Sequence, residues 1–367
     1  LSSPTPTATD SPIGITTFNP GLTRDVDNTF GPVFQGGAGY ASQNWLTLPK
    51  GTTTERYADS ANNAVDAGSS SARGIFHQGQ TPTRVRSLDF VSLPTLGDAQ
   101  DFGDLLASPG GRDGTGSLAS STRGIFAGGR DTGGTQLDDI EFITIATQGD
   151  AQIFGDLSAT RRLLSGLSNS TRGVFVGGFE SPTNVDTMEY ITIATTGDTT
   201  DFGNIISGAR GMGAFASPVK GVFGGGYSPS ASVNTINFIT ISSTGNSQDF
   251  GDLILNRNEI TGASNSTRGL FAGGYNPAHT NIIQYVTIQS SGNAFDFGDL
   301  LNTRNGQGGA ASSTRALFAG GYDGSVLTDD IYYVNIATTG NAVSFGELIP
   351  SGTNQTSGCS NGHGGLG

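Results

Sequence analysis

The sequence predicts an all-β fold built from repeated units, and three observations support this prediction. The ten-residue stretch 266–275 (STRGLFAGGY) recurs in near-copies such as 121–130 (STRGIFAGGR) and 313–322 (STRALFAGGY). The last glycines of the copies fall at positions 37, 79, 129, 178, 226, 274 and 321, so successive spacings lie between 42 and 50 residues. No unit shows the apolar spacing of an amphipathic helix. A near-constant period of this length is typical of a repeat architecture.

Four strand-like segments are predicted in each unit, as the last complete unit illustrates. The small and polar residues 306–312 lead to the apolar run 315–321 (RALFAGG), which ends in two glycines. The runs 331–336 (IYYVNI) and 343–348 (VSFGEL) follow and are separated by a turn rich in Gly and Asn. Short apolar runs between such turns predict β-strands. The glycine doublets are interpreted as structural, because a phosphate-binding loop needs a following helix.

The third segment of each unit predicts how the sheets pack. In 140–145 (IEFITI), side chains alternate between the two faces of the strand, so Ile140 and Phe142 share one face and Ile143 and Ile145 share the other. Both faces are apolar, and each sheet is therefore expected between two neighbouring sheets. The fourth segment adds a repeated phenylalanine that is expected in the core, at Phe102, Phe154, Phe202, Phe250, Phe297 and Phe345.

Four short antiparallel strands in 40–50 residues are typical of one blade of a β-propeller. Seven glycine-doublet strands are counted if 31–37 (GPVFQGG) is included, which predicts seven blades over residues 31–367. The C-terminal stretch 357–363 (SGCSNGH) resembles the small-residue segment that precedes such a strand, but no apolar strand follows it. We therefore expect this last strand to pair with the first blade and close the ring. Six blades with a divergent N-terminal segment is the alternative.

The order of residues within a unit resembles the Kelch repeat. Arg257, the apolar run 270–274 (LFAGG), Tyr285 and Phe297 follow one another as the corresponding residues do in a Kelch unit, although Phe297 stands where Kelch repeats usually carry Trp. The resemblance covers about residues 31–367 and implies the propeller architecture without implying an activity. The recurring segments STRG, TTGN and DFGDL also resemble repeat proteins of marine bacteriophages.

Composition excludes several classes of protein. The net charge of −13 disfavours binding to nucleic acid or to an anionic membrane surface, and no stretch has the roughly 20 apolar residues of a membrane span. One cysteine, Cys359, excludes an intramolecular disulfide framework. Residues 1–30 are rich in Pro, Ser and Thr at their start, and they are expected to form an arm or linker that contacts other virion or surface proteins.

The sequence predicts no catalytic, metal or cofactor site. His77, His279 and His363 lie on different units and have no motif partner. The acidic pairs 138–139 and 329–330 are not part of a calcium-binding loop pattern. The repeated arginines are expected to tie blade to blade, either through backbone carbonyls or through the repeated carboxylates, which are Asp104, Asp156, Asp252, Asp299 and Glu347.

Comparison of the units within the chain predicts which face binds a ligand. The turn before each glycine-doublet strand and the turn after each third strand hardly vary, whereas the other two connections differ from unit to unit. These two variable connections emerge on the same face of an antiparallel blade, as expected of a binding face on a rigid scaffold. The alternative is that these loops vary because nothing constrains them. The candidate ligand-binding residues lie in one of these connections, and they are Arg130, Phe179, Tyr227, Tyr275, His279 and Tyr322.

These observations predict a non-enzymatic structural and binding module. The likeness to phage repeat proteins favours a virion component, such as a tail, fibre, spike or capsid-decorating protein, with a virion or extracellular location. Aromatic residues among Asn, Ser and Asp suit a host-surface glycan or another protein, and oligomers are compatible with this role. The alternative is a secreted or surface carbohydrate-active propeller enzyme, which requires two carboxylates roughly 5–10 Å apart in a cleft.

Overall fold

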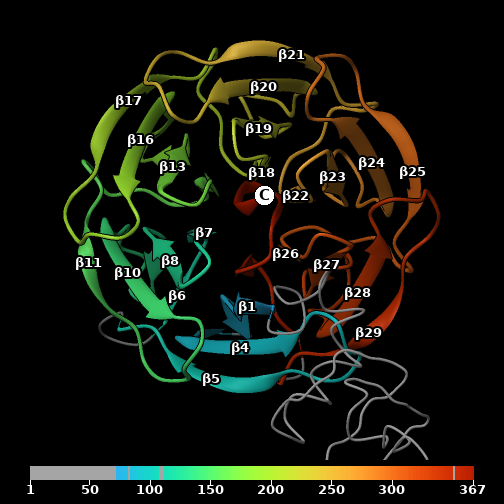
Figure 1. The fold of residues 1–367 in the computed structure, drawn as a ribbon, viewed down its shortest axis with the longest axis horizontal. Coiled ribbons are helices and arrows are strands. Elements are labelled where there is room, and N and C mark those ends of the chain that lie inside the picture. The colour runs from blue at the N-terminus through green and yellow to red at the C-terminus, as the bar shows by residue number, and fades with distance from the viewer. Residues whose placement is uncertain (1–71, 82, 107–110, 350–351) are drawn as a thin grey trace, which may run out of the picture. The chain divides into compact units, whose positions relative to one another are not determined.

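The computed structural model describes residues 72–81, 83–106, 111–349 and 352–367, and these residues form a β-propeller of six blades. Six sheets of four antiparallel strands stand around a common axis (Figure 1). Within the described residues, the only helical element is the short 3-10 turn η2 (Gly364–Leu366). None of these residues belongs to a helix with the length and hydropathy of a membrane span. The all-β class and the four-stranded blades are therefore confirmed.

The strands of each blade follow one another from the axis outward. Blade 1 contains β30 (Ser357–Ser360), β1 (Arg73–His77), β4 (Ser87–Ser92) and β5 (Gln100–Asp104). Blade 2 contains β7 (Gly116–Ala119), β8 (Arg123–Ala127), β10 (Asp139–Thr144) and β11 (Gln152–Asp156). Blade 3 contains β12 (Ser165–Ser168), β13 (Arg172–Val176), β16 (Thr187–Thr192) and β17 (Thr200–Asn204).

The remaining blades repeat this order. Blade 4 contains β18 (Gly213–Ala216), β19 (Lys220–Gly224), β20 (Thr235–Thr240) and β21 (Gln248–Asp252). Blade 5 contains β22 (Thr261–Ser264), β23 (Arg268–Ala272), β24 (Ile282–Thr287) and β25 (Phe295–Asp299). Blade 6 contains β26 (Gly308–Ala311), β27 (Arg315–Ala319), β28 (Asp330–Asn335) and β29 (Val343–Glu347).

The expectation of seven blades is not supported, and the described residues form the six of the alternative. The C-terminal strand β30 pairs with β1, with Gly74 opposite Ser360 and His77 opposite Ser357. The last strand therefore completes the blade that begins at Arg73, so this blade has four strands without a contribution from 31–37. That worn copy, and the expected domain boundary at residue 31, lie outside the described residues.

The repeated phenylalanine of the fourth strand lies in the core between blades, as predicted. Phe102 and Phe202 are each 1% exposed, and Phe345, the most exposed of the six, is 4% exposed. Each ring meets the aromatic residue of the third strand edge to face, for example Phe102 and Phe90 with centroids 5.9 Å apart. Burying such rings from every blade is the main apolar contribution to stability, since each aromatic removes a large area from water.

The two invariant turns lie together on one end of the propeller, which we call the constant-turn face, and they tie each blade to the next. In blade 3 the amide of Gly197 donates to the carbonyl of Phe154 in blade 2 over 2.7 Å. The carboxylate of Asp198 accepts from the amide of Asp156, also in blade 2, over 3.1 Å. Equivalent contacts recur between the other blades, with Asp or Asn as the acceptor. Their part in blade packing explains why these turns hardly vary.

The basic residue that begins each second strand also ties neighbouring blades. Arg123 donates from Nη1 to the carbonyl of Ile193 in the next blade over 2.9 Å, and its guanidinium lies 4.4 Å from the centroid of Phe142 in its own blade. The equivalent residues, which bond to carbonyls in the same way, are Arg73, Arg172, Lys220, Arg268 and Arg315. The prediction of blade-to-blade ties through backbone carbonyls is confirmed for this set.

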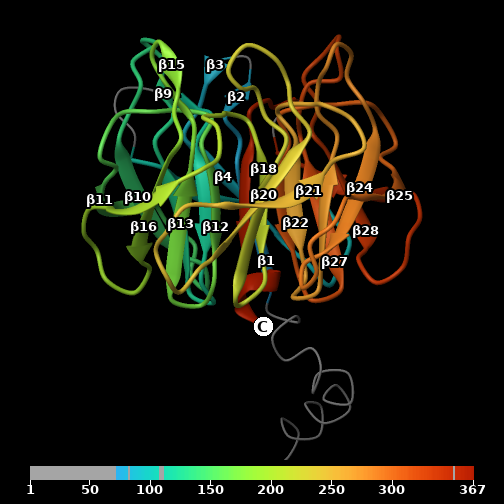
Figure 2. The same cartoon turned by 90° about the horizontal axis from the view of Figure 1, so that it is seen from above.

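The inner strands surround a narrow axial channel, and the chain ends at the constant-turn end of it. Figure 1 shows the C-terminus at the centre of the ring, and Figure 2 shows it on the side away from β3, β9 and β15. His363 Nε2 lies 2.9 Å from the carbonyl of Ala119, and η2 contacts β12 and β18. The C-terminal residues therefore contact inner strands of several blades.

Candidate functional site

The variable connections form the opposite end of the propeller, which we call the variable-loop face (Figure 2). Three short ladders stand there: β2 (Gln80–Thr81) with β3 (Thr83–Arg84), β6 (Arg112–Asp113) with β9 (Arg130–Asp131), and β14 (Phe179–Glu180) with β15 (Thr183–Asn184). In other blades, single bridges take the place of the β6–β9 pairing, namely Arg162–Phe179, Arg210–Tyr227, Asn258–Tyr275 and Asn305–Tyr322. Bridges such as Tyr227–Ser232 take the place of the β2–β3 and β14–β15 pairings. The backbone is thus similar in each blade, while the side chains that it carries differ.

The six predicted ligand-binding residues all lie on this face, but they fall into two separate groups. His279 lies between two tyrosines, with ring centroids 4.9 Å from Tyr275 and 5.5 Å from Tyr322. Tyr275 is 40% exposed. Arg130, Phe179 and Tyr227 lie on the neighbouring blades 2, 3 and 4 and belong to a cluster rich in arginine. Whether any of the six binds a ligand stays a prediction.

Arginine and aromatic side chains alternate across blades 3 and 4. The guanidinium of Arg162 lies 5.0 Å from the centroid of the Phe179 ring. The guanidinium of Arg210 lies between two rings, 4.9 Å from Phe179 and 4.6 Å from Tyr227. Arg210 Nη1 donates to Oδ1 of Asn184 over 2.8 Å, which fixes its position. Such cation–π contacts stabilise guanidinium groups close to a surface.

A buried carboxylate joins two more arginines to this group. The side chain of Asp113 is fully buried and accepts from Nε of Arg84 over 2.6 Å and from Nη2 of Arg130 over 3.0 Å. Burial, together with the nearby charges of Arg130, Arg210 and Arg84, lowers the pKa of Arg162, while Asp113 acts in the opposite direction. Four arginines, one of them at a predicted position, thus lie together around one carboxylate.

Below the face, a second set of arginines is completely buried. Arg112, Arg161, Arg257 and Arg304 are each at most 1% exposed, and each donates from Nη1 to the carbonyl of a doublet glycine sixteen residues later, such as Arg304 to Gly320 over 3.1 Å. Of the two kinds of partner predicted for these arginines, backbone carbonyls are confirmed. Among the described residues, none of the four pairs with the other predicted partners, the repeated carboxylates Asp104, Asp156, Asp252, Asp299 and Glu347, because the arginines point inward and those carboxylates lie on outer strands.

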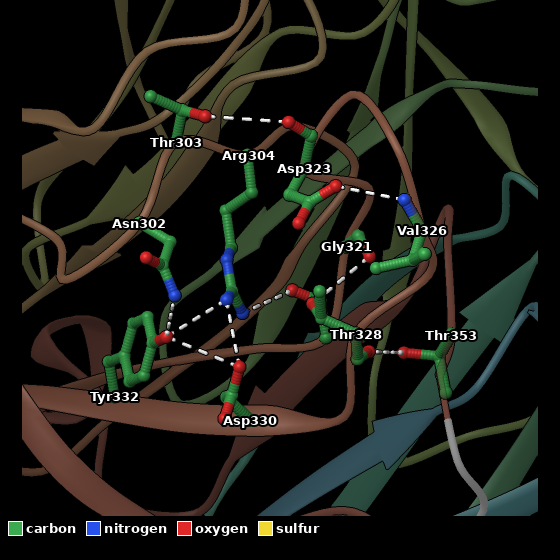
Figure 3. A network of polar contacts seen from close by, with 11 residues as sticks. Asn302, Thr303, Arg304, Gly321, Asp323, Val326, Thr328, Asp330, Tyr332 and Thr353 are labelled. Atoms are coloured by element: carbon green, nitrogen blue, oxygen red, sulfur yellow. Dashed lines mark hydrogen bonds and ion pairs between the residues drawn. The ribbon is translucent and has the colours of Figure 1, made fainter.

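The residue that faces each buried arginine varies. Arg112 pairs with Glu141, and Arg161 pairs with Glu189. Figure 3 shows that Arg304 instead reaches the hydroxyl of Tyr332 and the carboxylate of Asp330, both at 2.9 Å, while Asn302 donates to the same hydroxyl. Burial raises the pKa of Tyr332, so its hydroxyl stays protonated at neutral pH.

Blade 5 lacks an anionic partner at this position. Gln284, which is 0% exposed, faces Arg257 where Glu141 and Glu189 face their arginines. The Nε and Nη2 atoms of Arg257 and the Nε2 atom of Gln284 have no hydrogen-bond partner among the described residues. Burial lowers the pKa of Arg257 to about 10. These groups are buried structural residues, so they are not candidates for ligand contact.

A small cavity lies where the channel opens onto the variable-loop face. It has a volume of about 120 Å³ and is lined by Leu163, Glu259 and Gln355 together with glycines of the other blades. The carboxylate of Glu259 accepts a hydrogen bond from Asn305 Nδ2. Burial raises the pKa of Glu259, while that hydrogen bond and the charges of Arg210 and Arg162 oppose the rise.

The residues that could support metal or thiol chemistry are dispersed among the described residues. Asp138, Asp139 and Asp156 place carboxylate oxygens within 4.8 Å of one another near the rim of blade 2. Burial raises the pKa of Cys359 to about 12, so its thiol is protonated and shielded. His77 is 0% exposed and bonds to Thr115 and Val85 inside blade 1.

Sequence reasoning missed Arg84 and Arg162, and it counted Arg210 among the repeated arginines that tie blades. Arg210 follows the fourth strand at nearly the same spacing as Arg161 and Arg257, which suggests a place in the buried set. The structure puts Ala209 at that place, because Gly178 donates to the carbonyl of Ala209 as Gly226 does to that of Arg257. Arg210 is one residue further on and faces the surface, as Arg162 does. Alignment of the Ala209–Arg210 and Arg161–Arg162 pairs would have revealed both.

Comparisons with known proteins leave the family open: no protein-family model and no curated protein sequence matches this chain.

Proposed function

We propose that the protein is a non-enzymatic structural and binding module that holds its partner on the variable-loop face. One observation supports this proposal above the others. The invariant turns take part in blade-to-blade hydrogen bonds, whereas the variable-loop face presents different side chains on equivalent backbone bridges. Side chains that take no part in blade packing are free to become contact residues on a rigid scaffold.

The partner that we propose is a host-surface glycan or another virion protein. The Kelch-like order of residues and the phage-like segments support a bacteriophage virion component, in a tail, fibre, spike or decorating protein. Exposed aromatic rings such as Tyr275 suit the apolar face of a sugar ring. We further propose that β30 closes the ring and that residues 1–30, which lie outside the described residues, contact a neighbouring protein.

A glycan array tests this proposal. The wild-type protein is compared with Tyr275→Ala and Tyr322→Ala, which remove rings from the variable-loop face. Phe295→Ala is the matched control, because Phe295 is 63% exposed and lies on an outer strand of blade 5. Loss of at least one glycan signal in the tyrosine variants alone is expected. Binding that survives both tyrosine substitutions would contradict the choice of face.

A further inference from the structure

The arginine sector of the variable-loop face has hydrogen-bond donors that no described residue occupies. This sector comprises Arg84, Arg130, Arg162 and Arg210. Arg84 and Arg130 share Asp113, and Arg210 bonds to Asn184. The guanidinium of Arg162 makes no hydrogen bond or ion pair with another described residue, and it lies against the ring of Phe179. A guanidinium carries five donors in a planar fork that suits a carboxylate or a sulfate.

The blade architecture does not require an arginine at this position. The residues that occupy the place of Arg162 in the other bridges are Asp113, Arg210, Asn258, Asn305 and Asn354. Asparagine forms the same backbone bridge in three of the blades. Arg162 and Arg210 therefore add two cations to neighbouring blades without a structural need for their charge.

The sector carries excess positive charge on a strongly acidic protein. Four arginines against Asp113 leave a formal charge of +3 among these five residues, although the chain carries −13. The buried carboxyl of Glu259 interacts electrostatically with Arg210 and Arg162 and lowers this excess when it is ionised. Asp131 and Glu180 lie one residue beyond Arg130 and Phe179 and moderate this charge, but the carboxylate of Asp131 accepts from the amide of Thr135 in its own loop. Arg162 and Arg210 both contact the ring of Phe179, and an anion that accepts hydrogen bonds from these guanidiniums reduces the repulsion between them.

We propose that this sector binds a single anionic group, a sulfate ester or a carboxylate, carried on a saccharide. The inference rests on the proposed function, and it assigns acidic saccharides as the ligand class. Phe179 and Tyr227 hold the two guanidiniums in place and offer ring faces beside them. The net charge of the chain repels long polyanions, which favours a ligand whose charges are isolated on a largely neutral sugar.

Isothermal titration calorimetry with saccharides that differ only in charge tests the proposal. The probes are a neutral dextran oligosaccharide, the same oligosaccharide with one sulfate ester and the same oligosaccharide with one terminal uronic acid, and a poly-aspartate peptide is the non-sugar control. Wild-type protein is expected to bind at least one acidic saccharide more tightly than neutral dextran and more tightly than poly-aspartate. The sulfated and uronic probes distinguish a sulfate from a carboxylate as the recognised group.

Arg162→Gln should weaken acidic-saccharide binding roughly tenfold, which is the effect of losing one charge-assisted hydrogen bond. Lys220→Gln removes the same charge on the constant-turn face and should leave binding unchanged. Equal affinity of Arg162→Gln and wild type, or an equal loss in Lys220→Gln, would overturn the site. Binding of poly-aspartate as tight as that of the saccharides would overturn the ligand class. If the wild type binds neutral and acidic saccharides equally well, this inference is refuted but the proposed glycan function is not. If it binds no saccharide at all, the proposed glycan function is refuted as well.

Discussion

Gln284→Glu is expected to stabilise the propeller, because it supplies the anion that Arg257 lacks. Oε1 of Gln284 accepts from the amide of Ile254 over 2.6 Å, and its Nε2, a donor, has no partner among the described residues. In blade 2 the matching Glu141 accepts from the amide of Leu106 through Oε1 and from Arg112 through Oε2. A glutamate at 284 would therefore keep the amide bond and replace the unpaired donor with an acceptor for Arg257.

The size of the effect follows from the burial of Arg257. A pKa of Arg257 lowered from its ordinary value to about 10 corresponds to roughly 3 kcal/mol of uncompensated burial of the charge. The new carboxylate must itself leave water, so the substitution regains only a part of these roughly 3 kcal/mol. We expect a gain in the free energy of unfolding of about 2 kcal/mol, which is the size of a hydrogen bond between charged groups. In a domain of about 300 residues, that gain raises the midpoint of thermal unfolding by about 3 °C.

Thermal and urea unfolding at neutral pH measure this change. Ser290→Glu, on an exposed turn of the same blade, controls for the added charge alone. Glu141→Gln is the reciprocal variant, and it should lose about 3 kcal/mol because it leaves Arg112 without its nearest carboxylate. A Gln284→Glu protein no more stable than Ser290→Glu would refute the reasoning, since desolvation of the carboxylate would then cancel the pairing.

Three further predictions concern stability. Burial lowers the pKa of His77 to about 4, so below pH 6.5 the unfolded chain binds a proton there before the folded chain does. The free energy of unfolding of the wild type, measured by urea titration, should therefore fall by up to about 3 kcal/mol between pH 6.5 and pH 4. His77→Gln should lack this part of the pH dependence. Burial raises the pKa of Asp89, and its Oδ1 has no hydrogen-bond partner among the described residues. Asp89→Asn should therefore be more stable than the wild type at pH 7 by about 1 kcal/mol. The difference should shrink in acid, where the wild-type carboxyl is protonated, and thermal unfolding at neutral and at acidic pH measures it. Removal of 357–367 deletes β30 and should abolish cooperative unfolding measured by circular dichroism, whereas removal of 361–367 should leave it cooperative.

The strands were predictable from the sequence because the repeat places the same residue types at the same positions. Strand 140–145 was expected from its alternating pattern, and the structure assigns Asp139–Thr144. The faces of the blade were predictable for the same reason, since turns that tie blades cannot vary. The partners of the buried arginines were not, because an arginine that follows an outer strand gives no indication of whether it turns inward or outward.

The arginine sector could not be predicted from residue spacing alone. Its members come from connections of blades 1 to 4 and meet only when the blades stand side by side. Arg210 and Arg161 occupy nearly the same place by counting, yet Arg210 lies at the surface and Arg161 in the core, because Arg210 takes the bridge position of Arg162. Hydrogen-bond register decides which way such a side chain points, and a one-residue shift reverses its face.

Residues at equivalent positions also alternate between successive blades, and this alternation bears on the number of blades. A search for a period of about 48 residues does not detect it. The inner strands end in Ala-Ser in blades 2, 4 and 6, at Ala119, Ala216 and Ala311, and in Ser-Asn in blades 3, 5 and 1, at Ser168, Ser264 and Ser360. Each of these three serines donates from Oγ to the alanine carbonyl of the preceding blade, over 2.6 to 2.9 Å. Each of these bonds joins a blade with serine at this position to a preceding blade with alanine there, so the two kinds of blade alternate.

The residues at the mouth of the channel also alternate between two kinds from blade to blade, and the reason is steric. Six equivalent positions with positive φ surround it: glycine in blades 2, 4 and 6, and Leu163, Glu259 and Gln355 in blades 3, 5 and 1. A Cβ at Gly114 would stand 3.3 Å from Leu163 and 3.5 Å from Gln355, so two adjacent long side chains would crowd each other. In a ring closed as proposed, an alternation of two kinds is consistent only with an even number of blades. The repeating structural unit is therefore a pair of blades, and the separation of Leu163 and Glu259 gives it a length of 96 residues. Three such pairs make six blades, whereas the count of glycine doublets predicted seven.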